Sequence, residues 1–280
     1  MKRLQHSRSF AKKSLGQNFL TDSKIIEKIV ESVDPSTTDT IIEIGPGRGA
    51  LTERLVGSGA EVIAIELDRN LVPYLRETFA SRSNVQVVEG DALDVNLETV
   101  LSASCRPADA SKAKVVANLP YYISTAILKR LSEQRHFFSE LILMFQREVV
   151  ERIAAEPGDS ARGYLTVIVE ACFDVEKLFD VPPEAFLPVP KVWSSVVRLT
   201  PKRTHNYNEA AFRNIVSTAF SQKRKTILNN LRASLSNADS HLASAGIDAK
   251  RRAESLTLDE WVKLTQSISA SAGTEPHEGG

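Results

Sequence analysis

Cysteine, long apolar runs and N-terminal acidic residues are all scarce in this chain of 280 residues. Its two cysteines, Cys105 and Cys172, stand far apart, so we expect neither a disulfide framework nor a metal site. No apolar run approaches the roughly 20 residues that span a bilayer, and the first residues lack the apolar centre of a signal peptide. We therefore expect a cytoplasmic protein that uses neither a membrane nor a bound metal.

Net charge is zero, but the charges are unevenly distributed. Residues 1–20 hold five basic and no acidic residues, 201–270 hold eleven basic and six acidic, and 21–200 hold nineteen basic and twenty-seven acidic. Basic flanks are either ordinary solvated surface or patches that contact phosphate groups, and charge alone leaves both readings open. The basic start also suits an organellar transit peptide, although the compact motif that begins at Gly16 argues against one.

Short apolar runs alternate with amphipathic helical patterns between residues 40 and 201. The expected strands cover 40–45, 61–68, 85–93, 113–120, 140–146, 165–181 and 194–200. A helical pattern over 21–33 precedes them, with Thr21 or Asp22 as its expected N-cap. This alternation predicts an α/β fold with a parallel sheet that is covered on both faces.

The chain divides by pattern into four parts. After Pro201 the strand patterns stop, and only helical patterns follow, over 208–222, 225–235 and 256–268. We predict a basic N-terminal arm over 1–20, a Rossmann-like α/β domain over 21–201, a small helical domain over 202–268 and a disordered tail over 269–280.

Polar residues and glycines end four successive expected strands. The first strand leads into a glycine-rich turn over 45–49, which permits close approach of a ligand to the backbone. Glu66 ends the second strand, where a carboxylate accepts hydrogen bonds from both hydroxyls of a ribose. Asp91 ends the third, within reach of an adenine amino group, and Asn118 ends the fourth. Ligands of open α/β sheets bind at this edge, so we predict a nucleoside-containing cofactor there.

The spacing of the glycines separates two classes of cofactor-binding protein. NAD-binding Rossmann proteins show G-x-G-x-x-G, whereas this turn reads E-x-G-x-G-x-G, with Gly45, Gly47 and Gly49 as its glycines. The leading glutamate and the acidic strand ends resemble class I S-adenosylmethionine-dependent methyltransferases. The resemblance implies S-adenosyl-L-methionine as the cofactor.

The fourth strand ends in Asn118-Leu119-Pro120-Tyr121, which resembles the [N/D/S]-P-P-[Y/F] motif of methyltransferases that act on nucleobase amino groups. An adenine N6 lone pair is delocalised into the ring and is a poor nucleophile. Hydrogen bonds from N6–H to the Asn118 side-chain oxygen and the Leu119 carbonyl favour a more nucleophilic nitrogen, and Pro120 fixes that carbonyl. Tyr121 offers a face on which the extruded base stacks. In-line alignment is then the main catalytic task, with no metal required.

Residues from about 12 to 265 resemble one family, the ribosomal RNA adenine N6,N6-dimethyltransferases, and the resemblance implies an enzyme. One departure is Ala126, where the family often has proline, and we expect it to affect only the start of a helix. The matching segments occur in the family's order: KKSLGQNFL, EIGPGRGALT, ELD, GDAL, NLPYYIST, MFQREVVERI, FLPVPKVWSSVVRL and AFSQKRKTILNNL.

The resemblance also implies site residues that the strand pattern does not indicate. Asn18 and Leu20 join the strand-end positions as cofactor-binding residues, and Gln17 helps to close the site from the N-terminal side. Phe186 matches an aromatic residue proposed to stack on the opposite face of the target base. Without the resemblance, Phe186 reads as a core residue of a proline-rich loop.

The family divides by substrate. NLPYYIST and AFSQKRKTILNNL resemble the branch that dimethylates two adjacent adenosines in the 3′-terminal hairpin loop of small-subunit (16S) rRNA, late in 30S ribosome assembly. One alternative is the macrolide-resistance branch, which methylates large-subunit rRNA and typically has Asn-Ile-Pro-Tyr. Another is a non-catalytic assembly factor, which would have lost Asn118, Tyr121 or Glu66. A small-molecule enzyme would lack the basic helical domain, and a DNA enzyme would have a target-recognition domain.

Basic residues in both flanks are expected to contact RNA phosphates. With the family resemblance, the uneven charge favours RNA contact over ordinary surface. We expect the partner to be rRNA within a pre-30S particle, and we expect a monomer because no long apolar face is left uncommitted. The expected RNA-binding residues are Lys12, Lys13, Lys223, Arg224 and Lys225, the last three at the start of a helix.

Overall fold

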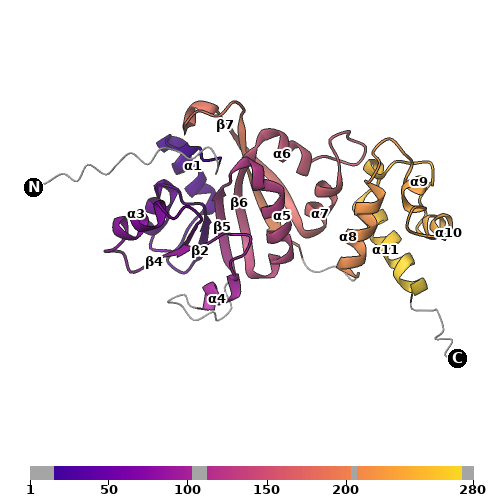
Figure 1. The fold of residues 1–280 in the computed structure, drawn as a ribbon, viewed down its shortest axis with the longest axis horizontal. Coiled ribbons are helices and arrows are strands. Elements are labelled where there is room, and N and C mark those ends of the chain that lie inside the picture. The colour runs from indigo at the N-terminus through magenta and orange to yellow at the C-terminus, as the bar shows by residue number, and fades with distance from the viewer. Residues whose placement is uncertain (1–15, 103–111, 203–206, 273–280) are drawn as a thin grey trace, which may run out of the picture. The chain divides into compact units, whose positions relative to one another are not determined.

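The computed structural model describes residues 16–102, 112–202 and 207–272. In this part of the chain, seven strands form the main sheet, in the order β4-β3-β2-β5-β6-β9-β7 (Figure 1). The first five of these strands pair in parallel, and β9 runs antiparallel to β6. The bounds are β2 (Thr40–Ile44), β3 (Glu61–Glu66), β4 (Val85–Glu89), β5 (Ala113–Asn118), β6 (Phe138–Gln146), β7 (Phe173–Val181) and β9 (Ser194–Pro201).

Helices connect the parallel strands, because a parallel pair needs a crossover connection. Every residue of β2 and β3 is buried, so both faces of the sheet are covered and the predicted α/β class is confirmed. Asp22 caps the first helix as predicted, accepting hydrogen bonds from the backbone N–H groups of Lys24 and Ile25. The helices are α1 (Ser23–Val33), α2 (Ala50–Gly57), α3 (Leu71–Thr78), α4 (Leu97–Ser102), α5 (Ser124–Glu133), α6 (Arg147–Ile153), α7 (Tyr164–Cys172), α8 (Glu209–Ala219), α9 (Ile227–Leu231), α10 (Ala238–Ser244) and α11 (Leu258–Ala272).

One segment that was predicted as strand is a helix. Residues 165–172, expected to begin a strand that continues to 181, form most of α7, and β7 begins only at Phe173. Seven of the nine residues of α7 are buried. A helix that is buried on all sides shows no helical periodicity, and its β-branched residues favour a strand, so the prediction was wrong here.

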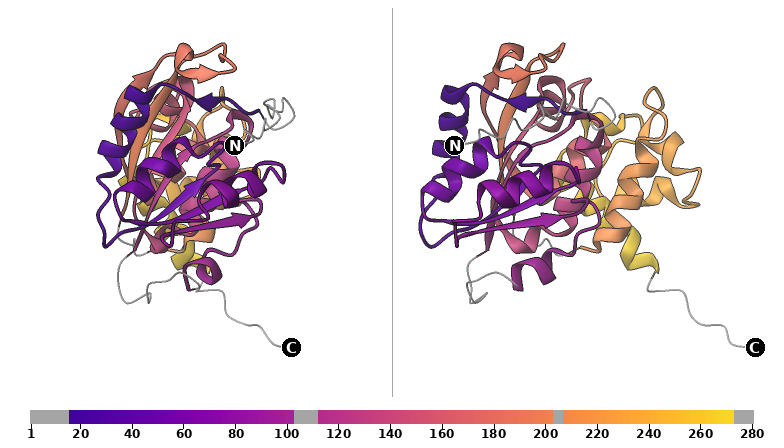
Figure 2. Two further views of the ribbon diagram at one scale, coloured as in Figure 1. Left: turned by 90° about the vertical axis from the view of Figure 1, so that its left-hand side faces the viewer. Right: turned by 60° about the vertical axis from the view of Figure 1, so that its left-hand side comes forward.

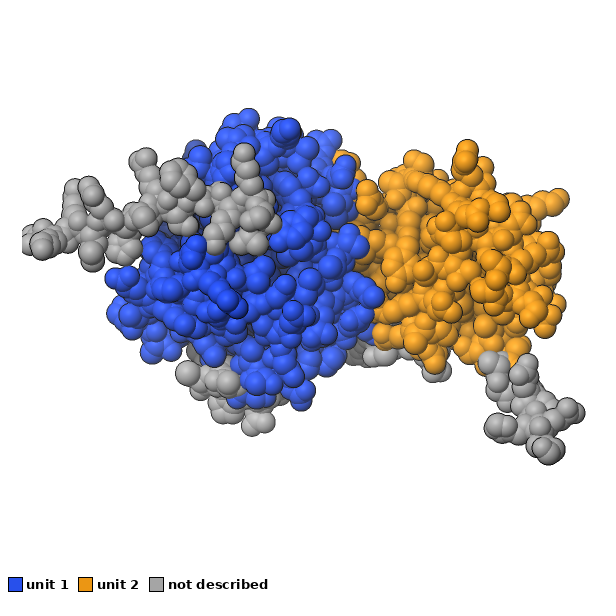
Figure 3. All heavy atoms as spheres, viewed as in Figure 1, with its two compact units in different colours: residues 1–150, 174–201 blue, residues 151–173, 202–280 orange. Residues whose placement is uncertain are grey.

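The chain divides into two compact units, which Figure 3 colours separately. Unit 1 contains Met1–Val150 and Asp174–Pro201, and unit 2 contains Glu151–Phe173 and Lys202–Gly280. The core of unit 2 joins residues of α7, α8 and α11 around the fully buried Trp261. Residues 151–173 thus pack with the C-terminal helices, although the sequence pattern groups them with the sheet. None of the described helices is long and apolar enough to cross a membrane.

A two-stranded antiparallel pair fixes the start of the described chain. In it, β1 (Phe19–Leu20) pairs with β8 (Phe186–Leu187), and Figure 2 shows the indigo β1 beside the segment that contains β8. The backbone N–H groups of Thr21 and Asp22 both donate to the Ala185 carbonyl, at 2.8 and 3.2 Å. These bonds hold residues 16–18 at the edge of the main sheet where the parallel strands end.

Two cationic side chains, one from β5 and one from β9, bond to the C-terminal end of α1. The last carbonyl groups of a helix lack partners within it. Lys114 in β5 donates from Nζ to the carbonyl groups of Val33 and Asp34, each at 2.8 Å, and Arg198 in β9 donates to that of Ser32 at 3.0 Å. The carboxylate of Glu140 lies 3.4 Å from the lysine nitrogen and 3.3 Å from the arginine Nε.

We predict that Lys114→Met lowers the free energy of unfolding by about 1–3 kcal/mol, because it removes the charged donor of the Val33 and Asp34 carbonyls and of the Asp39 carboxylate, which lies 3.2 Å from the lysine nitrogen. Urea unfolding at pH 7 measures the change. Lys129→Met, on the exposed face of α5, is the matched control and should change stability by less than about 0.5 kcal/mol. Equal losses in the two variants would show that the contacts of Lys114 contribute nothing specific.

Candidate active site

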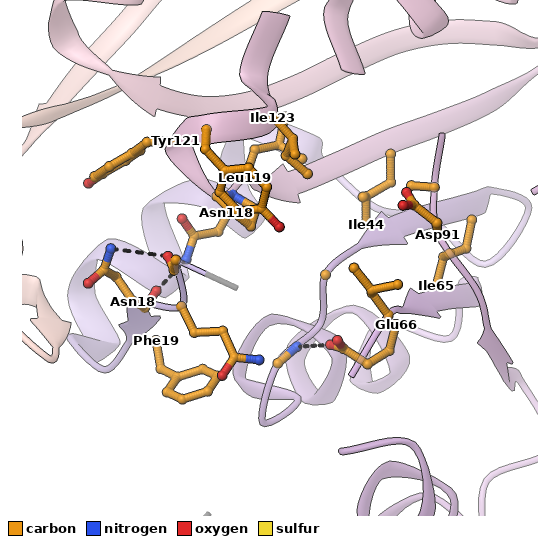
Figure 4. A pocket seen from close by; sticks show the side chains of 18 of the residues that line it. Asn18, Phe19, Ile44, Ile65, Glu66, Asp91, Asn118, Leu119, Tyr121 and Ile123 are labelled. Atoms are coloured by element: carbon orange, nitrogen blue, oxygen red, sulfur yellow. Dashed lines mark hydrogen bonds between the residues drawn. The ribbon is translucent and has the colours of Figure 1, made fainter. Parts of the chain in front are cut away.

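A pocket lies at the carboxyl ends of β2, β3, β4 and β5 (Figure 4). The N-terminal segment before β1 completes its wall. All the predicted cofactor-binding and catalytic residues line this pocket except Leu20 and Phe186. The lining residues are Gly16, Gln17, Asn18, Phe19, Ile44, Gly45, Gly47, Ile65, Glu66, Leu67, Gly90, Asp91, Ala92, Asn118, Leu119, Pro120, Tyr121, Tyr122 and Ile123.

Two glycines of the turn after β2 keep the pocket accessible. Gly45 and Gly47 have φ angles of 70° and 59°, in the left-handed region that other residues seldom adopt. A Cβ atom at Gly45 would meet no atom within 4 Å, so the absent side chain leaves open space beside the backbone. A Cβ atom at Gly47 would lie 3.0 Å from the ring of Phe19, so glycine also permits the N-terminal segment to pack over this turn.

Glu66 at the end of β3 is the main buried acid of the pocket. Only 5% of the residue is exposed, and burial raises the pKa of its carboxyl group. Its Oε2 accepts a hydrogen bond from the Gly47 N–H at 3.0 Å and its Oε1 from the Asp68 N–H at 2.8 Å, which opposes that rise. Each oxygen retains a second lone pair, so the carboxylate can also accept hydrogen bonds from two ligand hydroxyls.

Apolar side chains line the same part of the pocket. Ile65 and Leu67 flank Glu66, and Ala92 follows Asp91, whose Oδ1 accepts a hydrogen bond from the Leu93 N–H at 2.9 Å. Such a wall suits a flat, apolar ring with a polar edge, as in a purine. Sequence reasoning missed these apolar residues, because an Ile or Leu beside a strand end has the same signal as a core residue.

The N-terminal segment is bonded to two strand ends. The Gln17 side-chain amide donates to Oδ2 of Asp68 at 3.0 Å. The Asn118 side-chain amide donates to the backbone oxygen of Asn18 at 3.1 Å, as Figure 4 shows. Asp68 is only 2% exposed and has no role in the sequence prediction. The placement of Gln17 and Asn18 accords with closure of the site from the N-terminal side.

The Asn118–Tyr121 motif presents polar atoms to the pocket from the end of β5. The Asn118 amide nitrogen bonds to the Asn18 carbonyl, so the side-chain oxygen is the end that is left to accept a ligand donor. Tyr121 is positioned by a hydrogen bond of 2.9 Å between its hydroxyl and that of Ser194, which is fully buried at the start of β9. Burial raises the pKa of the Tyr121 hydroxyl, so this group stays neutral.

Leu20 and Phe186 lie beside the pocket without lining it. They are register partners in the β1–β8 pair, 7% and 2% exposed, and both belong to the core cluster of unit 1. Buried apolar packing accounts for both side chains here. The expected contacts of Leu20 with the cofactor and of Phe186 with a target base therefore stay predictions.

The expected RNA-binding residues are only partly described. Lys12 and Lys13 lie outside the described residues. Residues 223–225 are exposed, but they form a turn before α9, which begins at Ile227 with Thr226 as its N-cap, so the expected helix start is corrected. The Lys223 Nζ atom donates to the Ser160 carbonyl at 2.6 Å.

Glu43 is a second buried acid, two residues before the start of the glycine-rich turn. It lies in β2, is 2% exposed, and accepts a hydrogen bond of 2.6 Å from the Thr52 hydroxyl. Burial is the main cause that raises its pKa to about 7, and the negative charge of Glu66 adds to the rise. The two acids therefore disfavour each other's ionisation.

Comparisons with known proteins identify a family and several relatives. The family model described as Ribosomal RNA adenine dimethylase matches residues 8–270. Proteins named Ribosomal RNA small subunit methyltransferase A match at 42% identity over 272 residues in Geobacter sulfurreducens, covering 94% of this chain and 97% of that protein, and at 43% over 267 residues in Lactiplantibacillus plantarum, covering 92% and 90%.

Solved structures show the same fold. A dimethyladenosine transferase from Plasmodium falciparum is 26% identical, with a TM-score of 0.76, over 91% of this chain and 98% of that one. The 23S rRNA methyltransferase ErmE is also 26% identical, with a TM-score of 0.67, over 90% of this chain and 100% of that one.

We predict that Glu43 makes the protein less stable as pH rises. Because its pKa rises from 4.5 to about 7 on folding, the native state holds a proton in this range that the unfolded state has released. Relative to Glu43→Gln, the wild type should lose about 3 kcal/mol of unfolding free energy between about pH 4 and pH 8, at about 1.4 kcal/mol per pKa unit. Denaturant unfolding at several pH values measures this difference, and parallel curves for the two proteins would contradict it.

Proposed function

Because the chain belongs to the ribosomal RNA adenine dimethylase family, we propose that it transfers methyl groups from S-adenosylmethionine to N6 of adenosines in small-subunit rRNA. The single observation that most supports this is the pocket in which the Asn118–Tyr121 motif and Glu66 lie at the ends of β5 and β3, the two strands on either side of β2. The relatives named for the small subunit are 40–43% identical to this chain, whereas the 23S rRNA enzyme is 26% identical. Large-subunit methylation is thus the less supported alternative.

The pocket residues fit the cofactor. The Glu66 carboxylate suits the two ribose hydroxyls, and the apolar wall with Asp91 at its edge suits an adenine ring. Gly45 leaves open space beside the backbone for the rest of the molecule. The pocket also gathers acids, which suits a cofactor with a sulfonium and an ammonium group.

The chain's own residues then act on the target amine. Bound S-adenosylmethionine supplies an electrophilic methyl group on a sulfonium. The Asn118 side-chain oxygen and the Leu119 carbonyl accept hydrogen bonds from N6–H and so direct the nitrogen lone pair. Tyr121, held by Ser194, stacks on the base and limits its rotation. The methylated nitrogen is cationic and strongly acidic, so its proton leaves without a side-chain base.

The finer substrate assignment is part of the proposal. We place the target as two adjacent adenosines in the 3′-terminal hairpin loop of 16S rRNA, within a pre-30S particle in the cytoplasm, with a monomeric enzyme. The exposed cluster of Lys223, Arg224 and Lys225 supports phosphate contact, which makes binding strongly dependent on salt. Methylation of both adenosines and contribution to late assembly follow from the family resemblance.

We predict that Glu66→Gln weakens the binding of S-adenosylhomocysteine by roughly 10- to 100-fold, because a charged acceptor of two hydrogen bonds becomes neutral. Titration calorimetry measures the dissociation constant. Glu89→Gln is the matched control, since Glu89 ends the next strand but lies outside the pocket and pairs with Arg69 at 3.3 Å. Unchanged affinity in Glu66→Gln would remove the ribose role.

We predict that Asn118→Ala lowers the methylation rate about 100-fold or more, the usual loss when one preorganised hydrogen-bonding group is removed. The assay uses tritiated S-adenosylmethionine with small subunits from a strain that lacks the modification, and with large subunits and protein-free rRNA in parallel. Asn70→Ala, exposed before α3, is the control and should retain wild-type activity.

The pattern of label separates the alternatives. Dimethyladenosine in small subunits alone supports the proposal, whereas label in large subunits would move the protein to the other branch. Cofactor binding without any label would indicate a non-catalytic assembly factor.

A further inference from the structure

Large apolar side chains gather on the surface beside the pocket. Of the seven large hydrophobic residues that are exposed in the described chain, four lie within one short segment of unit 1, over 187–193. A fifth, Tyr122, is 60% exposed and belongs to the pocket lining. We call Tyr122, Leu187, Val189, Val192 and Trp193 the rim surface.

Both ends of the segment over 187–193 are bonded to residues of the pocket. Leu187 is the register partner of Phe19, which lines the pocket. Ser194, directly after Trp193, bonds to the hydroxyl of Tyr121 at 2.9 Å. Tyr122 completes the connection, because its ring lies over Gly16, where a Cβ atom would come within 3.1 Å of it. Tyr122 thus lines the pocket itself, and the segment over 187–193 is joined at both ends to residues that line it.

Trp193 is exposed although its backbone is fixed. Its carbonyl accepts a hydrogen bond from the Arg147 N–H at 3.0 Å, and Ser194 begins β9 with its side chain fully buried. The exposure changes sharply at this point of the chain, because Trp193 is 48% exposed and both Ser194 and Ser195 are fully buried. The prolines at 188 and 190 restrict the segment further.

We propose that the rim surface binds an unpaired nucleobase of the RNA that neighbours the target adenosine, with the indole of Trp193 as the stacking face. The proposal rests on the proposed function, because it takes the pocket to hold the target base. Extruding one base into a pocket removes the stacking partner of its neighbour, and an exposed aromatic face replaces that partner. Lys191, also exposed in the same segment, adds a positive charge for the adjoining phosphate.

Stacking on Trp193 can be tested by removing one base at a time. The RNA is a hairpin with two adjacent adenosines in its loop, made as a set in which each unpaired nucleotide in turn lacks its base. For one position outside the target pocket, the wild type should bind the abasic RNA about 5- to 150-fold more weakly than the intact RNA. Trp193→Ala should bind both RNAs equally and at the weaker affinity. Tyr74→Ala, an exposed tyrosine in α3 outside the pocket, should retain the full difference.

Tryptophan fluorescence gives an independent readout. The chain has two tryptophans, and Trp261 is fully buried in unit 2, so the exposed Trp193 is the one that a stacked base can quench. Intact RNA should quench the wild type, and Trp193→Phe should abolish the quenching while retaining most of the affinity. A variant that merely disturbs folding would change circular dichroism and S-adenosylhomocysteine binding as well, and neither should change here.

Three outcomes would overturn the proposal. In one, Trp193→Ala weakens the binding of the intact RNA and of the abasic RNA by the same factor. In another, the wild type does not distinguish them at any position outside the target. In the third, the substitution changes binding to ribosomal particles but never to the hairpin, which would assign the surface to a part of the particle outside the hairpin. Methylation of small subunits by the wild type is measured separately, so failure of this proposal and failure of the proposed function remain distinguishable.

Discussion

The parallel register of four strands is the constraint on which the site depends. Ile44 at the end of β2 pairs with Ile65 in β3 and with Ala117 in β5, so Gly45, Glu66 and Asn118 each follow directly on the same line across the sheet. Glu66 in turn pairs with Glu89, two residues before Asp91. A shift of one residue in any of these pairs would also turn the side chains of a strand to the opposite face of the sheet. Because every residue of β2 and β3 is buried, such a shift would disrupt the packing on both faces.

This convergence places acids close together in a region with little water. Glu43, Glu66 and Asp68 are each no more than 5% exposed, and burial raises the pKa of the first two. Backbone N–H groups from Gly47 and Asp68 stabilise the charge of Glu66, and they are available only because the turns after β2 and β3 are formed. A cationic ligand in the pocket would favour the ionised form of Glu66, so cofactor binding and local stability are linked through this carboxylate.

The sequence predicts the strand-end residues well, because each stands at a visible change from apolar to polar. It does not predict their partners. Asp68 bonds to Gln17 across 51 residues and Ser194 to Tyr121 across 73, and no local pattern indicates such pairs. The helix α7 was missed for a related reason, since burial on all sides removes the periodicity that identifies a helix. Phe186 was read by resemblance as a stacking residue, yet its burial depends on its pairing with Leu20 in a distant segment.

In the proposed function, the pocket and the rim surface divide the recognition of a nucleobase into two physical tasks. Inside, the Asn118 side-chain oxygen and the Leu119 carbonyl would discriminate an exocyclic amine from a carbonyl, because an acceptor left unpaired in the bound complex costs about 1–3 kcal/mol. Outside, apolar side chains discriminate little between bases but offset the stacking that is lost when a base leaves its neighbours. The first task requires rigid placement, which the strand ends provide. The second requires only exposed flat surface at a fixed distance from the pocket, and the Tyr121–Ser194 bond sets that distance, because it joins the residue that lines the pocket to the residue beside Trp193.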